Sequence, residues 1–446
     1  MFLLLQTQTF VSKHKGLMNL KTAIYILGGV LLSTFVSCLG DGDNSEIIYS
    51  SDAEIISFSI KNDSIDTSLG AIKFSIDQVK GLIYNKDSAN YGLELTDRVI
   101  VTYSTASGSY LLNITDGDSV WVKSGDSIDL VKPVILQSYA LNGDAKKYTV
   151  TFNIHTIDPD SIGWKQVNNN LDFLNQDETK IMLLGGTFYC FTKNDVIKLN
   201  TSIDYAVNWT DRGDVNLPLD AVLSQIQLYG DSLFACTSSG DWYGAGINDD
   251  FISWTKKSSV YPVKNIFGSI AKKNLLVLAV EKDGISYSVF YDGKSISEPV
   301  SGSEIPNGLP VSAFSSISYE RANAGYLTII GGDSGTSWGT TNGSYWAPIG
   351  NLPFNMQEAN VFRYDNKFYL LNGIIGDTYN KSVYTSIDGS NTWQISPSKI
   401  NLPDNYIFRT GASVVVSSDN MIYIIGGKNG NNPVTDVWRG RLNKLN

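Results

Sequence analysis

The sequence of 446 residues predicts an all-β protein in which a β-sandwich is followed by a six-bladed β-propeller. Glycine (40), tyrosine (24) and tryptophan (9) are plentiful and charged residues make up only 17%, a composition that suits strands and tight turns. Short alternating segments recur in the first part of the chain. Tryptophans recur roughly every 46 residues in the remainder, a period typical of propeller blades.

The amino terminus carries a predicted export signal. Residues 22–36 form an apolar run that follows Lys21, and the run has signal-peptide length rather than the length of a membrane span. The stretch TFVSC, which ends at Cys38, resembles a bacterial lipobox, and this resemblance implies lipidation of Cys38. An ordinary signal peptide with an incidental cysteine is the alternative. We therefore expect residues 1–37 to be a lipoprotein signal peptide, with Met18 as an alternative start.

Residues 38–49 are polar and acidic, and they predict a flexible tether. The stretch LGDGDNSE behind Cys38 resembles the acidic export signal of surface lipoproteins from Bacteroidetes-type bacteria, although a simple solvated linker remains open. The resemblance implies a lipid-anchored protein of the outer membrane, exposed at the cell surface. The net charge of -10 argues against nucleic acid as a partner, because an acidic protein repels phosphate backbones.

Residues 50–157 predict one β-sandwich module. Alternating apolar and polar segments are bounded by Gly, Asn, Asp and Ser clusters, as in strands joined by turns. These segments are residues 55–60, 71–76, 99–103, 119–122 and 148–154. The module resembles the immunoglobulin-like domains that follow the lipid anchor in many such lipoproteins, although it lacks the Cys-Trp-Cys core of antibody domains. The resemblance implies a spacer that holds the next domain away from the membrane.

Residues 160–446 contain the repeat. The units place an apolar strand well ahead of a tryptophan, except that the unit near residue 300 has lost its tryptophan and is marked by Leu309-Pro310. Two of the apolar strands run into the glycine pairs Gly331-Gly332 and Gly426-Gly427. This order resembles the kelch repeat and implies a six-bladed kelch-like propeller. The last unit lacks its final strand, whereas the strand around Trp164 has no unit ahead of it. We therefore predict that the Trp164 strand completes the sixth blade and closes the ring.

The candidate ligand site lies in the loops that join the second strand of a blade to the third, and one blade to the next. These loops should converge on one face of the ring, where aromatic, carboxylate and amide groups suit a sugar. The candidate ligand-binding residues are Trp242, Asp333, Trp338, Tyr379, Asp404, Tyr406 and Arg409. The same side chains could instead pack blades together or lie in solvated turns. Arg409 in particular resembles the arginine of the kelch Pro-Arg-x-Gly segment, where bonding to loop carbonyls is an equal alternative.

The sequence also limits the chemistry that we expect. Without residues 1–37 the only histidine is His155, which excludes a multi-histidine metal site and disfavours a Ser-His-Asp triad. We therefore predict no metal and no cofactor. Residues 386–393 resemble the Asp-box of sialidase-like propellers, which implies a structural turn. For Cys190 and Cys236, the sequence favours buried free thiols over a disulfide.

Three functions remain open. The leading hypothesis is a surface lipoprotein whose propeller is a binding or scaffold module for a glycan or an outer-membrane protein. The second is a glycan-processing enzyme, sialidase-like or sugar isomerase-like. The repeat arginines disfavour it because they occupy different positions within their units; they are Arg212, Arg321, Arg363 and Arg409. The third is a structural subunit of an outer-membrane assembly, for which a large apolar surface patch would be the evidence.

Overall fold

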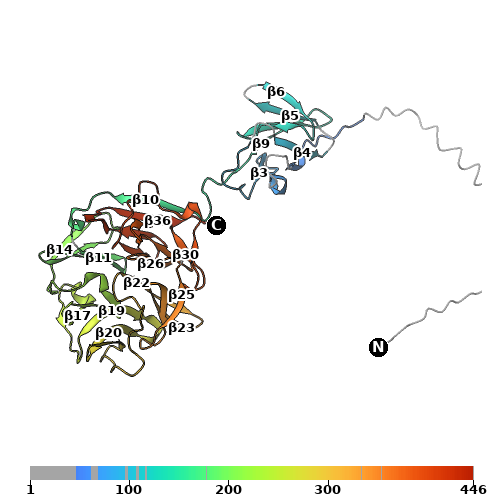
Figure 1. Cartoon of the computed structure of the whole chain (residues 1–446). Coiled ribbons are helices and arrows are strands. Elements are labelled where there is room, and N and C mark those ends of the chain that lie inside the picture. Colours follow the sequence, from blue (N-terminus) through green and yellow to red (C-terminus); the bar gives the residue numbers. More distant parts are fainter. Residues whose placement is uncertain are drawn as a thin grey trace, which may run out of the picture. The chain divides into compact units, whose positions relative to one another are not determined.

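The computed structural model describes residues 47–61, 69–95, 99–106, 110–115, 118–176, 178–332, 334–352 and 354–444. The expected signal peptide and Cys38 lie outside the described residues, as does Asp333. No helix among the described residues is long and apolar enough to span a bilayer. The chain divides into two compact units, Met1–Ile154 and His155–Asn446. Figure 1 shows both units.

The N-terminal unit consists of two β-sheets. A three-stranded sheet has the order β1-β4-β7, and a six-stranded sheet has the order β2-β3-β9-β8-β5-β6. The strands of the first sheet are β1 (Ile55–Ile60), β4 (Val99–Thr105) and β7 (Ser127–Ile128). Those of the second are β2 (Phe74–Asp77), β3 (Leu82–Asn85), β5 (Tyr110–Thr115), β6 (Asp118–Val122), β8 (Val134–Tyr139) and β9 (Ala145–Thr151). A short 3-10 helix, η1 (Leu69–Ala71), precedes β2.

One apolar core joins these two sheets, because alternate residues of their strands face the same side. Phe58 and Val101 of the smaller sheet belong to the same buried cluster as Leu136 and Tyr148 of the larger one. The Tyr148 hydroxyl also accepts a hydrogen bond from the backbone N–H of Ile55 at 3.1 Å. This bond satisfies a buried polar group and ties the two sheets together.

The C-terminal unit is built from six antiparallel sheets, taken over the residues that the structure describes. The first contains β11 (Glu178–Leu184), β12 (Thr187–Lys193), β13 (Ile197–Ser202) and β14 (Thr210–Asp214). The second contains β15 (Gln227–Tyr229), β16 (Ser232–Cys236), β17 (Trp242–Gly246) and β18 (Thr255–Lys256). The third contains β19 (Val263–Ile270), β20 (Leu275–Lys282) and β21 (Ile285–Tyr291). The fourth contains β22 (Phe314–Arg321), β23 (Ala324–Gly331), β24 (Ser334–Thr340) and β25 (Ala347–Asn351).

The fifth sheet contains β26 (Asn360–Tyr364), β27 (Lys367–Leu371), β30 (Tyr384–Ser386) and β31 (Gln394–Ile395). The sixth contains β32 (Ser413–Val416), β33 (Ile422–Ile425), β36 (Val437–Leu442) and β10 (Ile162–Asn168). Two small hairpins extend the fifth and sixth sheets: β28 (Ile374–Ile375) with β29 (Thr378–Tyr379), and β34 (Lys428–Asn429) with β35 (Asn432–Pro433). The connecting 3-10 helices are η2 (Asp172–Leu174), η3 (Leu223–Gln225), η4 (Ile247–Asp249), η5 (Ala271–Lys273) and η6 (Ser398–Ile400).

The core of this unit lies between successive sheets rather than at one central point. Six buried apolar clusters each combine side chains of two neighbouring sheets, and one of them joins the sixth sheet to the first. In that cluster the rings of Phe188 and Tyr423 meet edge to face, with centroids 4.9 Å apart. The sheets therefore form a closed ring, in which β11, β22 and β26 lie near the middle and β14 and β17 towards the outside (Figure 1).

The ends of the repeat meet in the sixth sheet. β10 pairs antiparallel with β36, and Trp164 lies opposite Gly440 in this pairing. A Cβ atom on Gly440 would lie 2.5 Å from the Trp164 ring, so only glycine leaves room for the indole. A strand from the start of the unit thus covers the edge of a sheet whose other three strands come from its end.

The glycines that follow the second strands have a steric role. Gly427 follows β33 with φ +96°, and a Cβ atom there would lie 2.6 Å from the carbonyl oxygen of Thr410 and 2.9 Å from the amide nitrogen of Ala412. Gly373 follows β27 with φ +83°, and its Cβ atom would lie 2.7 Å from a backbone carbonyl oxygen, that of Gln357. Glycine is required at both positions by its φ angle and by the close backbone contact.

The segment that resembles an Asp-box forms a turn between β30 and β31. The Asp388 carboxylate accepts hydrogen bonds from the backbone N–H groups of Asn391 and Thr392 at 3.1 and 2.9 Å, and from the Thr392 hydroxyl at 2.6 Å. Such side-chain to backbone bonds fix a turn locally. The segment therefore has the structural role that the resemblance implies.

Candidate functional site: the axial cavity

A cavity of about 620 Å³ lies on the axis of the ring, and we call it the axial cavity. Its wall is made by the innermost strands and the segments that lead into them, because the first strand of each sheet faces the axis. Five of the six sheets contribute, all except the β19 sheet. The polar wall residues include Glu178, Lys180, Ser224, Gln225, Gln227, Ser315, Ser316, Glu358, Asn360, Thr410 and Lys428.

Hydrogen bonds between neighbouring sheets fix the shape of this wall. At each junction named here, a polar side chain of one innermost segment bonds to the backbone of the next, which satisfies groups that β pairing leaves free. These bonds are Ser224 N to Glu178 Oε1 (2.9 Å), Ile181 N to Ser413 Oγ (2.9 Å), Ser315 Oγ to Ala359 O (2.6 Å) and Asn360 Nδ2 to Ala412 O (2.7 Å). The cavity is therefore a preformed site with polar side chains held in place.

Two charged residues of β11, Glu178 and Lys180, face the neighbouring η3 segment. They are two positions apart in the strand and therefore lie on the same side of it. The Lys180 ammonium donates a hydrogen bond to the carbonyl oxygen of Ser224 at 3.1 Å. Glu178 forms an ion pair with Lys193 of β12, with 2.6 Å between Nζ and Oε2. The carboxylate thus connects two sheets and is already bound to a cation other than Lys180.

The environment of Lys180 disfavours its charged form. The surrounding protein removes water from the ammonium, and this desolvation lowers the pKa of Lys180 from 10.5 to about 8, while the charge of Glu178 opposes the shift. A lysine whose charge is poorly compensated, in a cavity with fixed polar groups, is a marker of a binding or reactive site.

A thiol lies directly behind the cavity wall. The Gln225 side-chain oxygen accepts hydrogen bonds from the Cys236 thiol at 3.0 Å and from the backbone N–H of Ile266 at 3.2 Å. Cys236 and Cys190 are both buried free cysteines, as the sequence favoured. Burial raises the pKa of Cys236 to about 12 and also raises the pKa of Cys190. Both therefore remain protonated packing residues rather than nucleophiles near neutral pH.

The two candidate tryptophans of the sequence analysis are buried between sheets. Trp242 is 2% exposed, stacks on Phe234 with centroids 5.4 Å apart, and donates its indole N–H to the carbonyl oxygen of Ser258 at 3.3 Å. Trp338 is 9% exposed and belongs to the cluster between the third and fourth sheets. Neither ring is free to stack on a ligand, because the neighbouring sheet covers it.

Arg409 and Tyr406 are also buried. The Arg409 guanidinium donates hydrogen bonds to the carbonyl oxygens of Ile407 and Gly426 at 2.7 and 3.1 Å, and pairs with Asp436. It lies 4.4 Å from the centroid of the Tyr406 ring. Arg409 therefore bonds to loop carbonyls, which is the structural alternative to ligand binding that the sequence offered for this residue.

The remaining candidates lie apart from the axial cavity. Tyr379 in β29 is half-buried, and its hydroxyl accepts a hydrogen bond from the backbone N–H of Gly430. Asp404 is exposed in the loop before Tyr406. None of the candidates that the structure describes lines the axial cavity, although Thr410, which follows Arg409, does.

The candidate residues that the sequence offers are drawn mainly from aromatic side chains in loops, so the residues of the axial cavity are not among them. A usable signal exists, because Glu178 and Lys180 interrupt the start of an otherwise apolar strand, as Asn360 does in β26. Polar side chains at the beginning of several innermost strands predict a polar axis.

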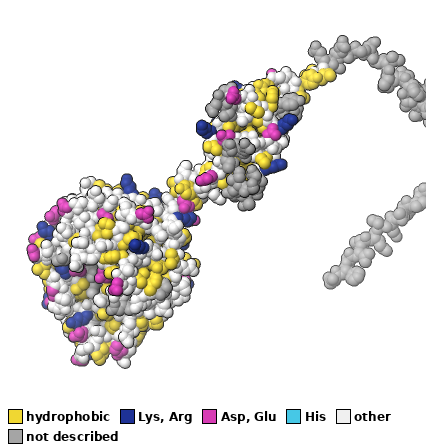
Figure 2. Space-filling model, turned by 45° about the horizontal axis from the view of Figure 1, so that its top comes forward, with side chains coloured by type: hydrophobic (Ala, Val, Ile, Leu, Met, Phe, Trp, Pro, Cys, Tyr) yellow, Lys and Arg dark blue, Asp and Glu magenta, His cyan; other side chains and the backbone are white. Residues whose placement is uncertain are grey.

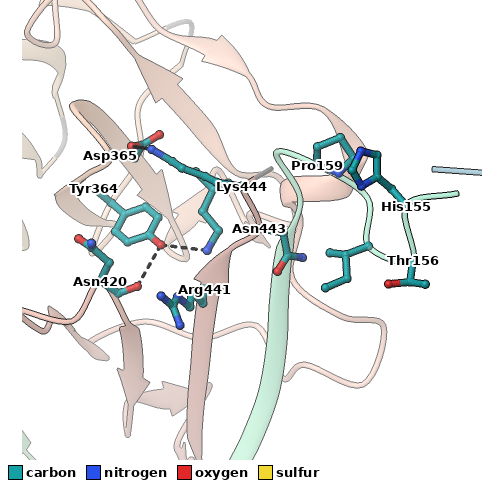
Figure 3. A pocket seen from close by; sticks show the side chains of 11 residues that line it. His155, Thr156, Pro159, Tyr364, Asp365, Asn420, Arg441, Asn443 and Lys444 are labelled. Atoms are coloured by element: carbon teal, nitrogen blue, oxygen red, sulfur yellow. Dashed lines mark hydrogen bonds and ion pairs between the residues drawn. The ribbon is translucent and has the colours of Figure 1, made fainter. Parts of the chain in front are cut away.

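A second pocket, of about 440 Å³, lies beside the carboxyl end of β36 (Figure 3). His155, Thr156 and Pro159 form one side of it, and Tyr364, Asp365, Asn420 and Lys444 lie on another. Its polar groups bond to one another: the Tyr364 hydroxyl donates to the carbonyl oxygen of Asn420 at 3.0 Å, and Lys444 pairs with Asp365. This pocket is the weaker candidate, because these groups already satisfy each other.

Comparisons with known proteins identify both units. Residues 158–446 match the family described as "DUF6242 beta propeller domain", and residues 49–152 match the "Domain of unknown function (DUF6242) N-terminal domain". A search of curated proteins found no match. Among solved structures, one titled "Structure of YjhT" is 11% identical, with a TM-score of 0.44 over 61% of this chain and 96% of that chain. The C-terminal unit is therefore a β-propeller, as the sequence predicts.

Proposed function

Because the chain belongs to the DUF6242 family, which joins an N-terminal domain of unknown function to a β-propeller, we propose that it is a binding module whose ligand occupies the axial cavity. The observation that carries this proposal is the axial cavity itself. It has the volume of a small-molecule site and fixed polar groups from five sheets. In an all-β protein, the axis of a propeller is the place where several sheets can direct side chains at one ligand.

The proposal extends to the architecture of the whole chain. Each of the six sheets is one blade of a kelch-like propeller, and the six clusters between sheets support this count. The N-terminal unit is an immunoglobulin-like sandwich that serves as a spacer, which its two packed sheets support. Lipidation of Cys38 anchors the protein to the outer membrane, a proposal that rests on the sequence alone.

The ligand that suits the axial cavity is a hydroxylated small molecule or the end of a glycan. Hydroxyl, amide and charged groups line the wall, and such groups exchange hydrogen bonds with sugar hydroxyls. Sugar binding through the predicted aromatic face has less support, because Trp242 and Trp338 are buried. Acidic and basic side chains are interspersed on the visible propeller surface, rather than gathered by sign (Figure 2).

A glycan array probed with the soluble chain that starts after Cys38 tests the proposal. The blocking variant is Ser224→Trp, because the Ser224 side chain is exposed within the cavity while its backbone makes the contacts to Glu178 and Lys180. Ser301→Trp is the matched control on an exposed loop. We expect glycan binding that Ser224→Trp abolishes and Ser301→Trp retains. Binding that survives in Ser224→Trp would overturn the proposal, and an array without any bound glycan would overturn a glycan as the ligand.

A further inference from the structure

We propose that the axial cavity binds an oxyanion, a carboxylate or a phosphate or sulfate group, at the ammonium of Lys180. This inference rests on the proposed function and specifies the chemistry of the ligand. Its first support is geometric. Lys180 lines the cavity, and among the residues that the structure describes its ammonium donates one hydrogen bond, to the carbonyl oxygen of Ser224 at 3.1 Å. An ammonium has three protons to donate, so further donor capacity faces the cavity.

The carboxylate of Glu178 is occupied by partners other than Lys180. Both oxygens of Glu178 have other partners: Oε2 lies 2.6 Å from the Lys193 ammonium, and Oε1 accepts the backbone N–H of Ser224 at 2.9 Å. Lys193 is held in this position by a second bond, to the carbonyl oxygen of Ala221 at 2.9 Å. Glu178 is therefore committed to Lys193, and the charge of Lys180 remains poorly compensated.

The charges around the axial cavity favour an anion. The ionisable groups of its wall are Glu178, Lys180, Glu358 and Lys428, and Lys193 is paired to the first of these. The wall thus carries two cationic and two anionic side chains, and Lys193, which is not part of the wall, pairs with Glu178. With Glu178 engaged in this way, two lysines of the wall remain against one carboxylate, an arrangement that favours an anion.

The pKa of Lys180 is lowered to about 8, which agrees with this geometry. Burial removes water that would stabilise the charged ammonium, and a bound anion would stabilise it in place of that water. Binding requires the charged form. The affinity should therefore be constant at pH values well below 8 and fall about tenfold for each pH unit above it. The other ionisable groups of the cavity wall are Glu178, Glu358 and Lys428, and Glu178 is the one whose charge acts on Lys180.

The test is isothermal titration calorimetry of the soluble chain that starts after Cys38, at constant ionic strength. The probes are inorganic phosphate, inorganic sulfate, D-glucuronate and, as the neutral analogue, D-glucose. The variant is Lys180→Gln, which retains a donor for the Ser224 carbonyl. The matched control is Lys198→Gln, an exposed lysine on β13. Each titration is run at about pH 6.5 and about pH 9.5, on either side of the pKa of Lys180.

We expect at least one anion to bind more tightly than D-glucose, and for sulfate or D-glucuronate, whose charge is the same at both pH values, the affinity should fall at least about tenfold at the higher pH. Lys180→Gln should weaken binding of that anion at least about tenfold and remove its pH dependence, whereas Lys198→Gln should leave both unchanged. Phosphate or sulfate binding would assign an ester or free inorganic anion as the ligand, and binding of D-glucuronate alone would assign a sugar acid.

Two results would overturn the inference. The first is equal anion binding by Lys180→Gln and the unsubstituted chain. The second is binding of D-glucose that Ser224→Trp abolishes and Lys180→Gln does not change. In the second case the axial cavity would still be a ligand site, so the proposed function would stand without the oxyanion. Failure of the proposed function would give a different result, because no probe would then show binding that Ser224→Trp abolishes.

Discussion

Arg409 and Asp436 form a buried ion pair in which two guanidinium nitrogens lie 2.5 and 3.2 Å from the two carboxylate oxygens. Arg409 is fully buried and belongs to the segment that leads into β32, while Asp436 directly precedes β36. The indole N–H of Trp438 also donates to the Asp436 carboxylate, at 2.9 Å. The pair therefore connects the innermost strand of the sixth sheet to its third strand.

Removing one partner of this pair should strongly destabilise the propeller. Arg409→Met leaves the Asp436 carboxylate buried without its counter-ion, and we expect the free energy of unfolding to fall by about 3 to 5 kcal/mol. Urea denaturation followed by tryptophan fluorescence measures this change. The double substitution Arg409→Met with Asp436→Leu should recover most of the loss, because no unpaired charge remains. A single variant as stable as the unsubstituted chain would contradict the structural role of the pair.

Gly427 provides a second test of the fold. In Gly427→Ala the new methyl group would lie 2.6 Å from the Thr410 carbonyl oxygen, and φ is +96°. We expect a loss of about 2 to 4 kcal/mol in the free energy of unfolding, from backbone strain and steric overlap. Gly430→Ala is the matched control, because Gly430 has φ +60° with nothing within 4 Å of a Cβ atom. The control should lose only about 1 kcal/mol, and equal losses in the two variants would refute the steric explanation.

Lys180 should make stability depend on pH. Its pKa is about 8 in the folded chain and 10.5 in its unperturbed state, so folding disfavours the ammonium. The resulting cost is fully present below pH 8 and disappears as the pH rises through 8 towards 10.5. Lys180→Met should therefore stabilise the protein at neutral pH by about 1 to 2 kcal/mol. Thermal unfolding of the two proteins across this pH range measures the difference in stability. We expect the extra stability of Lys180→Met to shrink as the pH rises, and extra stability that grows with pH would contradict the prediction.

The pairing of β10 with β36 predicts where the C-terminal unit can be cut. A chain of residues 155–446 retains β10 and should unfold cooperatively by itself, because its sheets and clusters are complete. A chain of residues 170–446 lacks β10, exposes the edge of β36, and should melt at lower temperature and associate through that edge. Thermal unfolding and size-exclusion chromatography of the two chains measure this difference. Equal melting temperatures for two monomers would show that β10 is dispensable.

The sequence predicted the propeller because its repeat depends on local requirements. Glycine is needed for a close backbone contact behind the second strand at Gly332, Gly373 and Gly427, so the same requirement recurs in several sheets. It leaves a visible period even where the residues between these glycines differ. The β-propeller is confirmed by the match of residues 158–446.

The candidate site could not be predicted in the same way. Trp242 begins β17 and Trp338 lies within β24, so both are strand residues whose rings face a neighbouring sheet. A boundary error of one or two residues turns such a buried ring into an apparent loop residue. The polar start of β11 marks Lys180 in the sequence, but the engagement of Glu178 by Lys193 exists only once the strands are paired, so the sequence alone could not show which charge is compensated.

The pairing of Trp164 with Gly440 also limits when the ring can close during synthesis. A ribosome makes β10 before any other strand of the propeller and β36 after all the others, so the ring cannot close until nearly the whole chain has been made. The contact joins residues that are far apart in sequence, and such contacts form slowly. Until β36 has been made, β10 has no partner strand in the sixth sheet and the ring stays open.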